Sequence, residues 1–220
     1  MADLKNLKHL LPDTRALLLE LIESCDFLSK YVLSGGSALA LYIGHRKSED
    51  LDFFTYEDNF NKQEIFKYLN RFDDVRILNQ TDEQVDVLFG TVKVTFFNAK
   101  WSFLKPEQPD LITGQFNLAT IESIAAMKVN VLFLRARYRD YYDLYFLIKR
   151  CLNIKKVFKC GLSIMPEITF KLFATALIYM DDIEDDNIDF LEPIEKLSKG
   201  KIRDFFQSEL SLSSRFGDIF

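Results

Sequence analysis

Apolar and polar residues follow two different spacings along this chain, and the spacing changes near the middle. Strict alternation indicates strands, while apolar residues three or four positions apart indicate helices. In the first half the pattern predicts strands at 31–33, 50–55, 75–80, 84–89 and 91–98, and helices at 12–29, 37–43 and 61–72. In the second half it predicts helices at 120–134, 138–150, 154–160, 166–180, 187–197 and 200–210. The fold class is therefore α+β, with a mixed α/β core over 1–105 and a helical domain over 106–220.

Residues with special backbone preferences support these boundaries. Pro12 suits the first turn of a helix, and Gly44 suits the end of one. Asn59 or Asn61 would cap the third helix. Gly90 sits between two alternating stretches, which indicates a hairpin. Pro106 and Pro109 mark the connecting loop between the two halves.

Composition limits the classes of function. The 220 residues are 48% hydrophobic and include 21 Phe and 9 Tyr, enough for an aromatic core. The net charge of -5 argues against a basic nucleic-acid coat, so a nucleic-acid partner would need a local patch. Cys25, Cys151 and Cys160 have no metal-ligand spacing, which favours a reducing compartment. No signal peptide or membrane-length apolar run is apparent, and we predict a cytoplasmic protein without a membrane partner.

The first candidate for chemistry is a glycine turn. Gly35, Gly36 and Ser37 lie between a predicted strand and a predicted helix. Backbone N–H groups at such a turn can bind phosphate, and the hydroxyl of Ser37 could donate to it as well. The alternative is an ordinary turn in which Ser37 caps the helix.

The second candidate is a pair of carboxylates on one strand. Asp50 and Asp52 would share one face, while Leu51 and Phe53 point into the core. Two neighbouring carboxylates repel unless a cation lies between them, and oxygen ligands suit Mg²⁺ or Mn²⁺. The alternative is a solvated strand face. Together with the glycine turn, the pair predicts a site for a nucleoside triphosphate and its metal.

Two groups of residues resemble those of one family. The first joins the glycine turn to Arg46, Ser48 and the Asp50/Asp52 strand; the second joins Lys128 to the segment Arg139-Asp140-Tyr141-Tyr142-Asp143-Leu144. In order and spacing they resemble the motifs of the AbiEii/AbiGii-type toxins. These proteins are nucleotidyltransferases of the DNA polymerase β-like superfamily and belong to toxin–antitoxin and phage-defence systems.

The resemblance implies a fold, a reaction and partners. A polymerase β-like core would be followed by a helical bundle, with the active site in a cleft between them. The enzyme would transfer NMP from an NTP to an acceptor hydroxyl, with tRNA or another RNA as the first acceptor and a protein as another. A cognate antitoxin is implied in the same way. Asp50 and Asp52 would hold the metal, and the glycine turn, Arg46, Ser48 and Lys128 would bind the nucleotide.

The second group also has a physical signature. Lys128 falls on an apolar stripe of its helix, so its amine must reach the edge or a buried anion. Asp140 and Asp143 share a helix face, and Arg139 with Asp143 could form a plain i,i+4 ion pair. The family motif implies that at least one of these acids faces the site, as base or as orienter of Lys128, and Asp143 is favoured.

One feature departs from the superfamily pattern. A third carboxylate is expected on a strand after the Asp50/Asp52 pair, but Thr95 occupies about that place. Asp86 on the preceding strand is a possible substitute. A second hypothesis is therefore a degenerate nucleotide-binding module, and a third is a protein-interaction module.

Three further groups leave two interpretations each. The acidic run at 181–186 lacks the pattern of a calcium loop, and we expect a solvated loop. Four tyrosines, Tyr138, Tyr141, Tyr142 and Tyr145, suit either base stacking or the core. A basic segment suits either RNA phosphates or a solvated helix face; it comprises Arg135, Arg137, Arg139, Lys149, Arg150, Lys155, Lys156 and Lys159.

Overall fold

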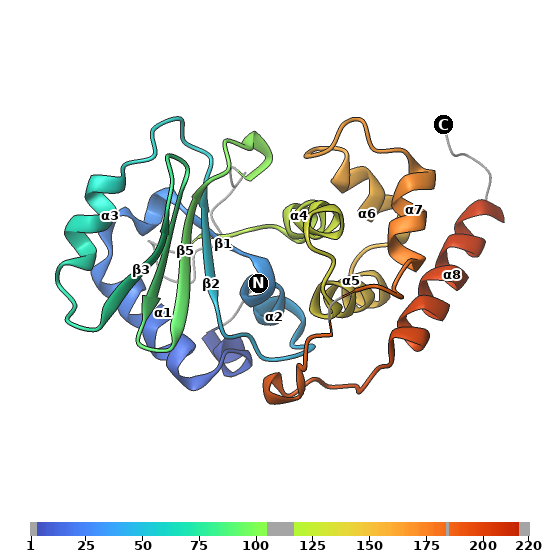
Figure 1. The fold of residues 1–220 in the computed structure, drawn as a ribbon, viewed down its shortest axis with the longest axis horizontal. Coiled ribbons are helices and arrows are strands. Elements are labelled where there is room, and N and C mark those ends of the chain that lie inside the picture. Colours follow the sequence, from blue (N-terminus) through green and yellow to red (C-terminus); the bar gives the residue numbers. More distant parts are fainter. Residues whose placement is uncertain (1–3, 105–116, 184, 216–220) are drawn as a thin grey trace. The chain divides into compact units, whose positions relative to one another are not determined.

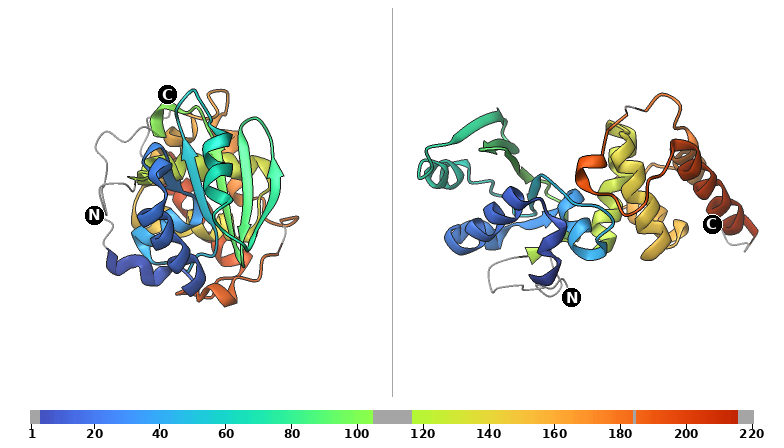
Figure 2. Two further views of the ribbon diagram at one scale, coloured as in Figure 1. Left: turned by 90° about the vertical axis from the view of Figure 1, so that its left-hand side faces the viewer. Right: turned by 90° about the horizontal axis from the view of Figure 1, so that it is seen from below.

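The protein is represented by a computed structural model that describes residues 4–104, 117–183 and 185–215. The chain divides into two compact units, Met1–Thr120 and Ile121–Phe220. The loop predicted around Pro106 and Pro109 lies outside the described residues. Figure 1 and Figure 2 show the strands in the first unit and a set of helices in the second.

The first unit is built on a six-stranded mixed sheet with the order β3-β4-β5-β2-β1-β6. Its strands are β1 (Val32–Ser34), β2 (Leu51–Thr55), β3 (Val75–Gln80), β4 (Gln84–Phe89), β5 (Val92–Asn98) and β6 (Asn117–Leu118). β2 runs parallel to β5 and antiparallel to β1. Its helices are η1 (Leu4–His9), α1 (Pro12–Ser24), η2 (Asp26–Lys30), α2 (Gly35–Ile43), α3 (Lys62–Leu69) and η3 (Ser102–Leu104).

Predicted helix ends are confirmed where a specific residue makes them. Pro12 opens α1, and the side chain of Asn61 accepts the N–H of Glu64 at the start of α3. Gly44 ends α2 in the left-handed conformation, with φ of +57°. The single helix predicted over 12–29 is wrong, because α1 ends at Ser24 and a separate 3-10 turn, η2, follows.

One face of the sheet forms the core of this unit. Along β2 the side chains of Leu51 and Phe53 are fully buried, and the alternate residues Asp52 and Phe54 are half-buried. Phe53 stacks on Phe96 of β5 with ring centres 5.7 Å apart. Phe27 of η2 also packs on Phe96. The alternation predicted for 50–55 is confirmed, and it turns Asp52 away from the core.

The second unit is helical. Its elements are α4 (Ile121–Leu134), α5 (Tyr138–Arg150), α6 (Ile154–Gly161), α7 (Phe170–Ile178), η4 (Asp189–Leu191) and α8 (Lys199–Arg215). α7 begins later than predicted because the Thr169 side chain caps it at Leu172 N–H. The predicted helix at 187–197 is wrong. Pro193 has no N–H to donate and disfavours a helical residue before it, and Glu192 takes φ of +47°.

Three of the four tyrosines belong to the core of this unit. Tyr141, Tyr142 and Tyr145 are buried. The hydroxyl of Tyr141 donates to the carbonyl of Ala176, and burial raises the pKa of Tyr141 to about 12. These rings are therefore packing residues, and base stacking by them is not available in this arrangement. Among the described residues, no helix is long and apolar enough to span a bilayer.

Candidate active site

The glycine turn and Asp52 meet in direct contact. Gly35 takes φ of +66° and begins α2 directly after β1. A Cβ atom at Gly35 would fall on the Asp52 carboxylate, and one at Gly36 would lie 2.6 Å from Nη2 of Arg46. Because glycine has no side chain, Asp52 and Arg46 can lie beside the first backbone N–H groups of α2. The structure brings together four residues that the sequence analysis selected.

A substitution at Gly35 tests this contact. We expect Gly35→Ala to destabilise the protein by about 1–2 kcal/mol, because φ near +66° is strained for alanine. We also expect it to lower activity, because the methyl group would displace Asp52. The control is Gly200→Ala in α8, where the added Cβ meets only Ser198 Oγ at 3.8 Å. Thermal melts and initial rates of both variants would check this, and equal effects of the two substitutions would contradict it.

The two serines of the first motif are held by hydrogen bonds to the protein's own backbone, Ser37 through its side chain and Ser48 through its main chain. Ser37 is buried, and its hydroxyl donates to the carbonyl oxygen of Asp50. This bond ties the first turn of α2 to the start of the carboxylate strand. Ser48 is also buried, and its backbone is bonded to His9 and Leu11. The Ser37 hydroxyl therefore already donates its hydrogen to Asp50. The groups of the turn that could bind a phosphate are its backbone N–H groups.

Arg46 is positioned by burial as well as by charge. Its side chain is 3% exposed, and Nη1 donates to the carbonyl oxygen of Lys47 at 2.9 Å. Nη2 faces Gly36. A fixed guanidinium at a helix N-terminus adds positive charge where an anion would bind.

A row of polar residues crosses the sheet at Asp52. Direct neighbours in register are Ser34 of β1, Asp52 of β2, Thr95 of β5, Asp86 of β4 and Asn79 of β3. Residues paired in register share one face of a sheet. This row therefore lies on the face opposite the Phe53 and Phe96 core.

The row shows where Thr95 and Asp86, the two residues considered at the position of a third carboxylate, lie relative to Asp52. Thr95 is the neighbour of Asp52, as expected, and Asp86 lies one strand further away. The Asp86 carboxylate accepts hydrogen bonds from Thr95 Oγ1 at 2.9 Å and from Gln84 Nε2 at 2.8 and 2.9 Å. Lys93 Nζ lies 3.8 Å from Asp86 Oδ1. Asp86 is thus held by Gln84, by Lys93 and by Thr95, and Thr95 lies between Asp86 and Asp52 in the row.

The donors present fit a metal that is shared with a substrate. Within the described part of the chain, no group of three His, Cys, Asp or Glu side chains could hold a metal ion. Asp50 and Asp52 are both half-buried, and Asp50 directly precedes β2. Mg²⁺ commonly uses one or two protein carboxylates and completes its shell with water and substrate phosphates. Asp52, which contacts the glycine turn, and Asp50, two residues before it, supply a donor set of that size.

The second group of candidates forms a buried ion cluster within the helical unit. Lys128 of α4 is 5% exposed, and Asp140 and Asp143 of α5 are fully buried. Lys128 Nζ lies 3.0 Å from Asp140 Oδ1 and 2.6 Å from Asp143 Oδ2. Arg135 adds two bonds of 3.1 Å to Asp140. The sequence predicts that Lys128 reaches either the edge of its helix or a buried anion, and this pair of acids supplies the anion.

In this cluster the cations Lys128 and Arg135 lie against the carboxylates of Asp140 and Asp143. Burial alone would raise the pKa of Asp140. The charges of Lys128 and Arg135, with their hydrogen bonds, outweigh burial and hold that pKa below its ordinary value. Asp140 is therefore ionised at neutral pH. Arg139, which the alternative interpretation pairs with Asp143, has its Nε 3.3 Å from the Asp186 carboxylate.

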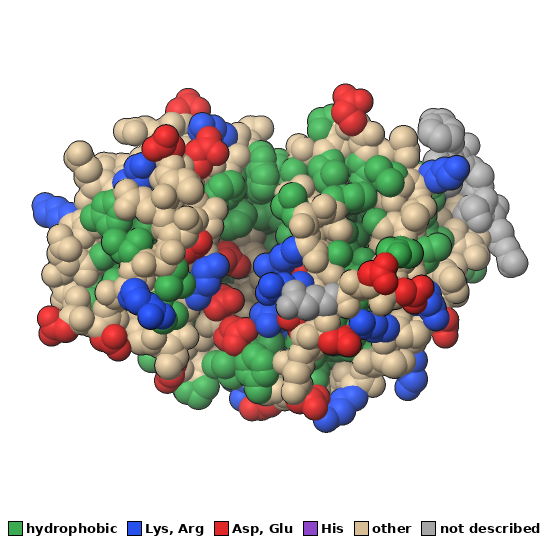
Figure 3. All heavy atoms as spheres, in the orientation of Figure 1, with side chains coloured by type: hydrophobic (Ala, Val, Ile, Leu, Met, Phe, Trp, Pro, Cys, Tyr) green, Lys and Arg blue, Asp and Glu red, His purple; other side chains and the backbone are tan. Residues whose placement is uncertain are grey.

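Some residues of the predicted basic segment form ion pairs within the helical unit. Arg135, Arg139 and Lys149 each bond a carboxylate of this unit, whereas Lys156 and Lys159 are exposed on α6. Acidic and basic side chains stand side by side on the face that Figure 3 shows. This arrangement favours the solvated helix face over a broad RNA-binding patch.

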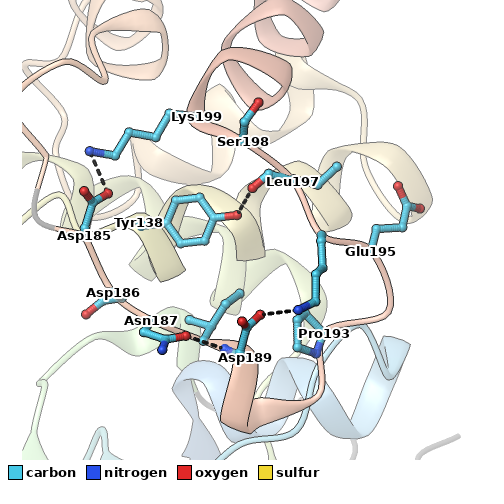
Figure 4. A pocket seen from close by; sticks show the side chains of 12 residues that line it. Tyr138, Asp185, Asp186, Asn187, Asp189, Pro193, Glu195, Leu197, Ser198 and Lys199 are labelled. Carbon is cyan, nitrogen blue, oxygen red and sulfur yellow. Dashed lines mark hydrogen bonds and ion pairs between the residues drawn. The ribbon is translucent and has the colours of Figure 1, made fainter.

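The helical unit also has a hollow of about 390 Å³, and its described lining includes neither Lys128 nor Asp140 nor Asp143. Figure 4 shows that charged pairs line it, with Asp185 on Lys199 at 2.8 Å and Asp189 on Lys196 at 3.1 Å. Tyr138 donates its hydroxyl to the carbonyl of Leu197 there. Of the described residues that line the hollow, none is a predicted site residue.

The sequence of this chain matches the family described as the nucleotidyl transferase AbiEii toxin of Type IV toxin–antitoxin systems. The match covers residues 17–101 and 92–175, and so includes both groups of candidates. The chain belongs to the AbiEii nucleotidyltransferase toxin family. It is a nucleotidyltransferase, and the predicted polymerase β-like fold is confirmed.

The chain is also similar to individual proteins. An uncharacterized protein of Aquifex aeolicus (strain VF5) is 29% identical over 196 residues, which are 86% of this chain and 95% of that protein. The structure resembles JHP933 from Helicobacter pylori, with a TM-score of 0.55, 21% identity and 93% of each chain covered. It also resembles MenT4, a nucleotidyltransferase toxin of Mycobacterium tuberculosis H37Rv, with a TM-score of 0.57, 17% identity and 90% and 84% of the two chains covered. These two likenesses show a shared fold.

Two features of the site escaped the sequence analysis. The polar row could not be predicted, because the register between strands does not follow from the sequence of any one strand. The alternating polar residues Gln84, Asp86, Lys93 and Thr95 were a partial signal. Arg135 was noted only as part of a basic segment, and its position five residues before Asp140 was the available clue.

Proposed function

We propose that this AbiEii-family enzyme transfers a nucleoside monophosphate from an NTP to a hydroxyl of tRNA or another RNA, using Mg²⁺ or Mn²⁺. The observation that supports this most is the contact between the Asp52 carboxylate and Gly35 at the first turn of α2. It puts a metal-binding type of group beside a phosphate-binding type of turn.

The proposed chemistry follows from the positions of these groups. The backbone N–H groups at Gly35, Gly36 and Ser37 and the guanidinium of Arg46 bind the triphosphate, and Ser48 helps to hold that loop. A divalent ion on Asp50 and Asp52 would neutralise charge on the phosphates. The acceptor oxygen forms a bond to the α-phosphorus, the bond to the β-phosphate oxygen breaks, and pyrophosphate leaves. One of the two carboxylates takes the proton of the acceptor hydroxyl.

Lys128, Asp140 and Asp143 have a proposed role in the same reaction. Lys128 contributes positive charge for the triphosphate, and the two acids fix the direction of its amine. Support comes from the family motif and from the short contacts of Lys128 Nζ with both carboxylates. We favour Asp143 as the closer partner, because its oxygen lies at 2.6 Å.

The biological setting is proposed on the family description. A toxin of a Type IV system implies an antitoxin encoded with it. We place the reaction in the cytoplasm, where NTPs and RNA are found. The three free cysteines are consistent with that reducing compartment.

One observation favours a second candidate. Thr95, and not an acid, is the neighbour of Asp52. A degenerate module would bind NTP and metal but transfer nothing.

The experiment is to incubate the protein with each of the four α-³²P NTPs, Mg²⁺ or Mn²⁺, and total cellular RNA. Labelled RNA supports the proposal and identifies the acceptor by size. Label on protein would show that the acceptor is a protein hydroxyl. NTP binding without any transfer would establish the degenerate module.

A further inference from the structure

Four aromatic side chains form a continuous surface beside the polar row. Trp101 stacks on Phe103 with ring centres 5.6 Å apart and planes at 15°. Trp101 also packs against Phe54 at 6.3 Å and Phe97 at 6.2 Å, and Phe54 lies 5.2 Å from Phe97. All four residues are half-buried, so part of each remains accessible. We name Phe54, Phe97, Trp101 and Phe103 the aromatic shelf.

The shelf shares its face of the sheet with Asp52. Phe54 lies two residues after Asp52 on β2, and Phe97 lies two residues after Thr95 on the parallel strand β5. Alternation keeps both rings on the face of the polar row. At a rise of about 3.3 Å per residue, the shelf begins roughly 7 Å from that row.

The glycine turn lies on the other side of Asp52. β1 runs antiparallel to β2 and pairs Val32 with Phe54 and Ser34 with Asp52. The chain therefore passes from the level of the shelf to the level of Asp52 and continues away from the shelf into Gly35. The order along this face is the phosphate-binding turn, then the carboxylate, then the aromatic shelf.

We propose that the aromatic shelf stacks the base of the bound NTP. This inference rests on the proposed function. With the outer phosphates at the glycine turn and the α-phosphate at Asp52, the ribose spans the gap and the base reaches Phe54, Phe97 and Trp101. Stacking tolerates every base because each has a π-face, and larger purines gain more contact. We therefore expect purine NTPs to bind more tightly than pyrimidine NTPs.

Trp101 provides a direct probe because it is the only tryptophan in the chain. Its emission is recorded, with excitation where nucleotides do not absorb, during titration of the full-length protein with ATP, CTP and inorganic tripolyphosphate. Calorimetry measures the affinity of each compound separately. We expect ATP to quench the emission at saturation, CTP to quench it with weaker binding, and tripolyphosphate to bind without quenching.

Variants separate base stacking from a structural effect. Trp101→Leu is expected to weaken ATP binding about 10-fold, in the range for one stacked base, and to leave tripolyphosphate affinity unchanged. Phe190→Leu, at an aromatic residue 50% exposed in the helical unit, is the matched control and should change neither affinity. Phe103→Leu keeps the probe and should also weaken ATP.

The outcomes distinguish this inference from the proposed function. If calorimetry shows ATP binding while Trp101 emission and the affinity of Trp101→Leu stay unchanged, the shelf is overturned and nucleotide transfer stands. If Trp101→Leu raises only the KM for RNA, the shelf serves the acceptor and the inference is overturned. If no nucleotide binds at all, the proposed function fails, and the shelf fails with it.

Discussion

Replacing Asp52 by asparagine is expected to lower the initial rate of nucleotide transfer about 10³-fold. Asparagine keeps the shape that contacts Gly35 but removes the charge that would attract a divalent ion. Charge stabilisation by a bound metal contributes several kcal/mol, and each 1.36 kcal/mol is a factor of ten in rate. Asp50→Asn should act in the same direction, and the double variant should show no transfer. Rates at several Mg²⁺ and Mn²⁺ concentrations measure the effect.

The control for this series is an acid outside the site. Asp73 is exposed between α3 and β3, so Asp73→Asn should keep the rate of the unchanged protein. Melting curves show whether each variant is folded. A folded Asp52→Asn variant that transfers nucleotide at the original rate would exclude Asp52 as a metal ligand.

Replacing Lys128 by methionine is expected to cause the largest loss of stability. Asp143 would remain fully buried without its cation at 2.6 Å, whereas Asp140 would retain Arg135. Removing one partner of a buried ion pair costs about 3–5 kcal/mol. For a chain of this size we expect the melting temperature to fall by about 10 °C. Thermal unfolding followed by circular dichroism at neutral pH measures it.

A second substitution isolates the cause. Lys128→Met combined with Asp143→Leu removes the stranded charge and leaves Asp140 with Arg135, so stability should largely return. Transfer activity should not return, because the proposed triphosphate ligand is still missing. Lys159→Met, on the exposed side of α6, is the matched control and should leave the melting temperature unchanged. A Lys128→Met variant as stable as that control would show that the acids do not depend on Lys128.

Local patterns predicted the parts of the fold that depend on neighbouring residues. The alternation at 50–55 placed Asp52 on the face away from the core, and Asn61 and Gly44 marked the ends of their helices. The prediction of a helix at 187–197 was wrong because it relied on helical spacing of apolar residues, although Pro193 disfavours a helix there. β6 was missed because a two-residue strand is defined by pairing with β1 and not by a sequence pattern.

The same division applies to the candidate site. The sequence alone was enough to select the glycine turn and both carboxylates as candidates, since each is local in the chain. It predicted that Lys128 needs an anion but left open which one, because the answer depends on how α4 packs against α5. It located Thr95 but could not show that Asp86 is held one strand further from Asp52. Register and helix packing are set by the whole core and cannot be derived from spacing alone.

The most direct test of nucleotide transfer is to compare two positions of the label. The protein is incubated with cellular RNA and metal in parallel with α-³²P ATP and γ-³²P ATP, beside the Asp50→Asn/Asp52→Asn variant. We predict label in RNA from the α-position only, and none with the variant. Label transferred from the γ-position would identify phosphoryl transfer and contradict the account, and so would α-label in RNA that persists in the double variant.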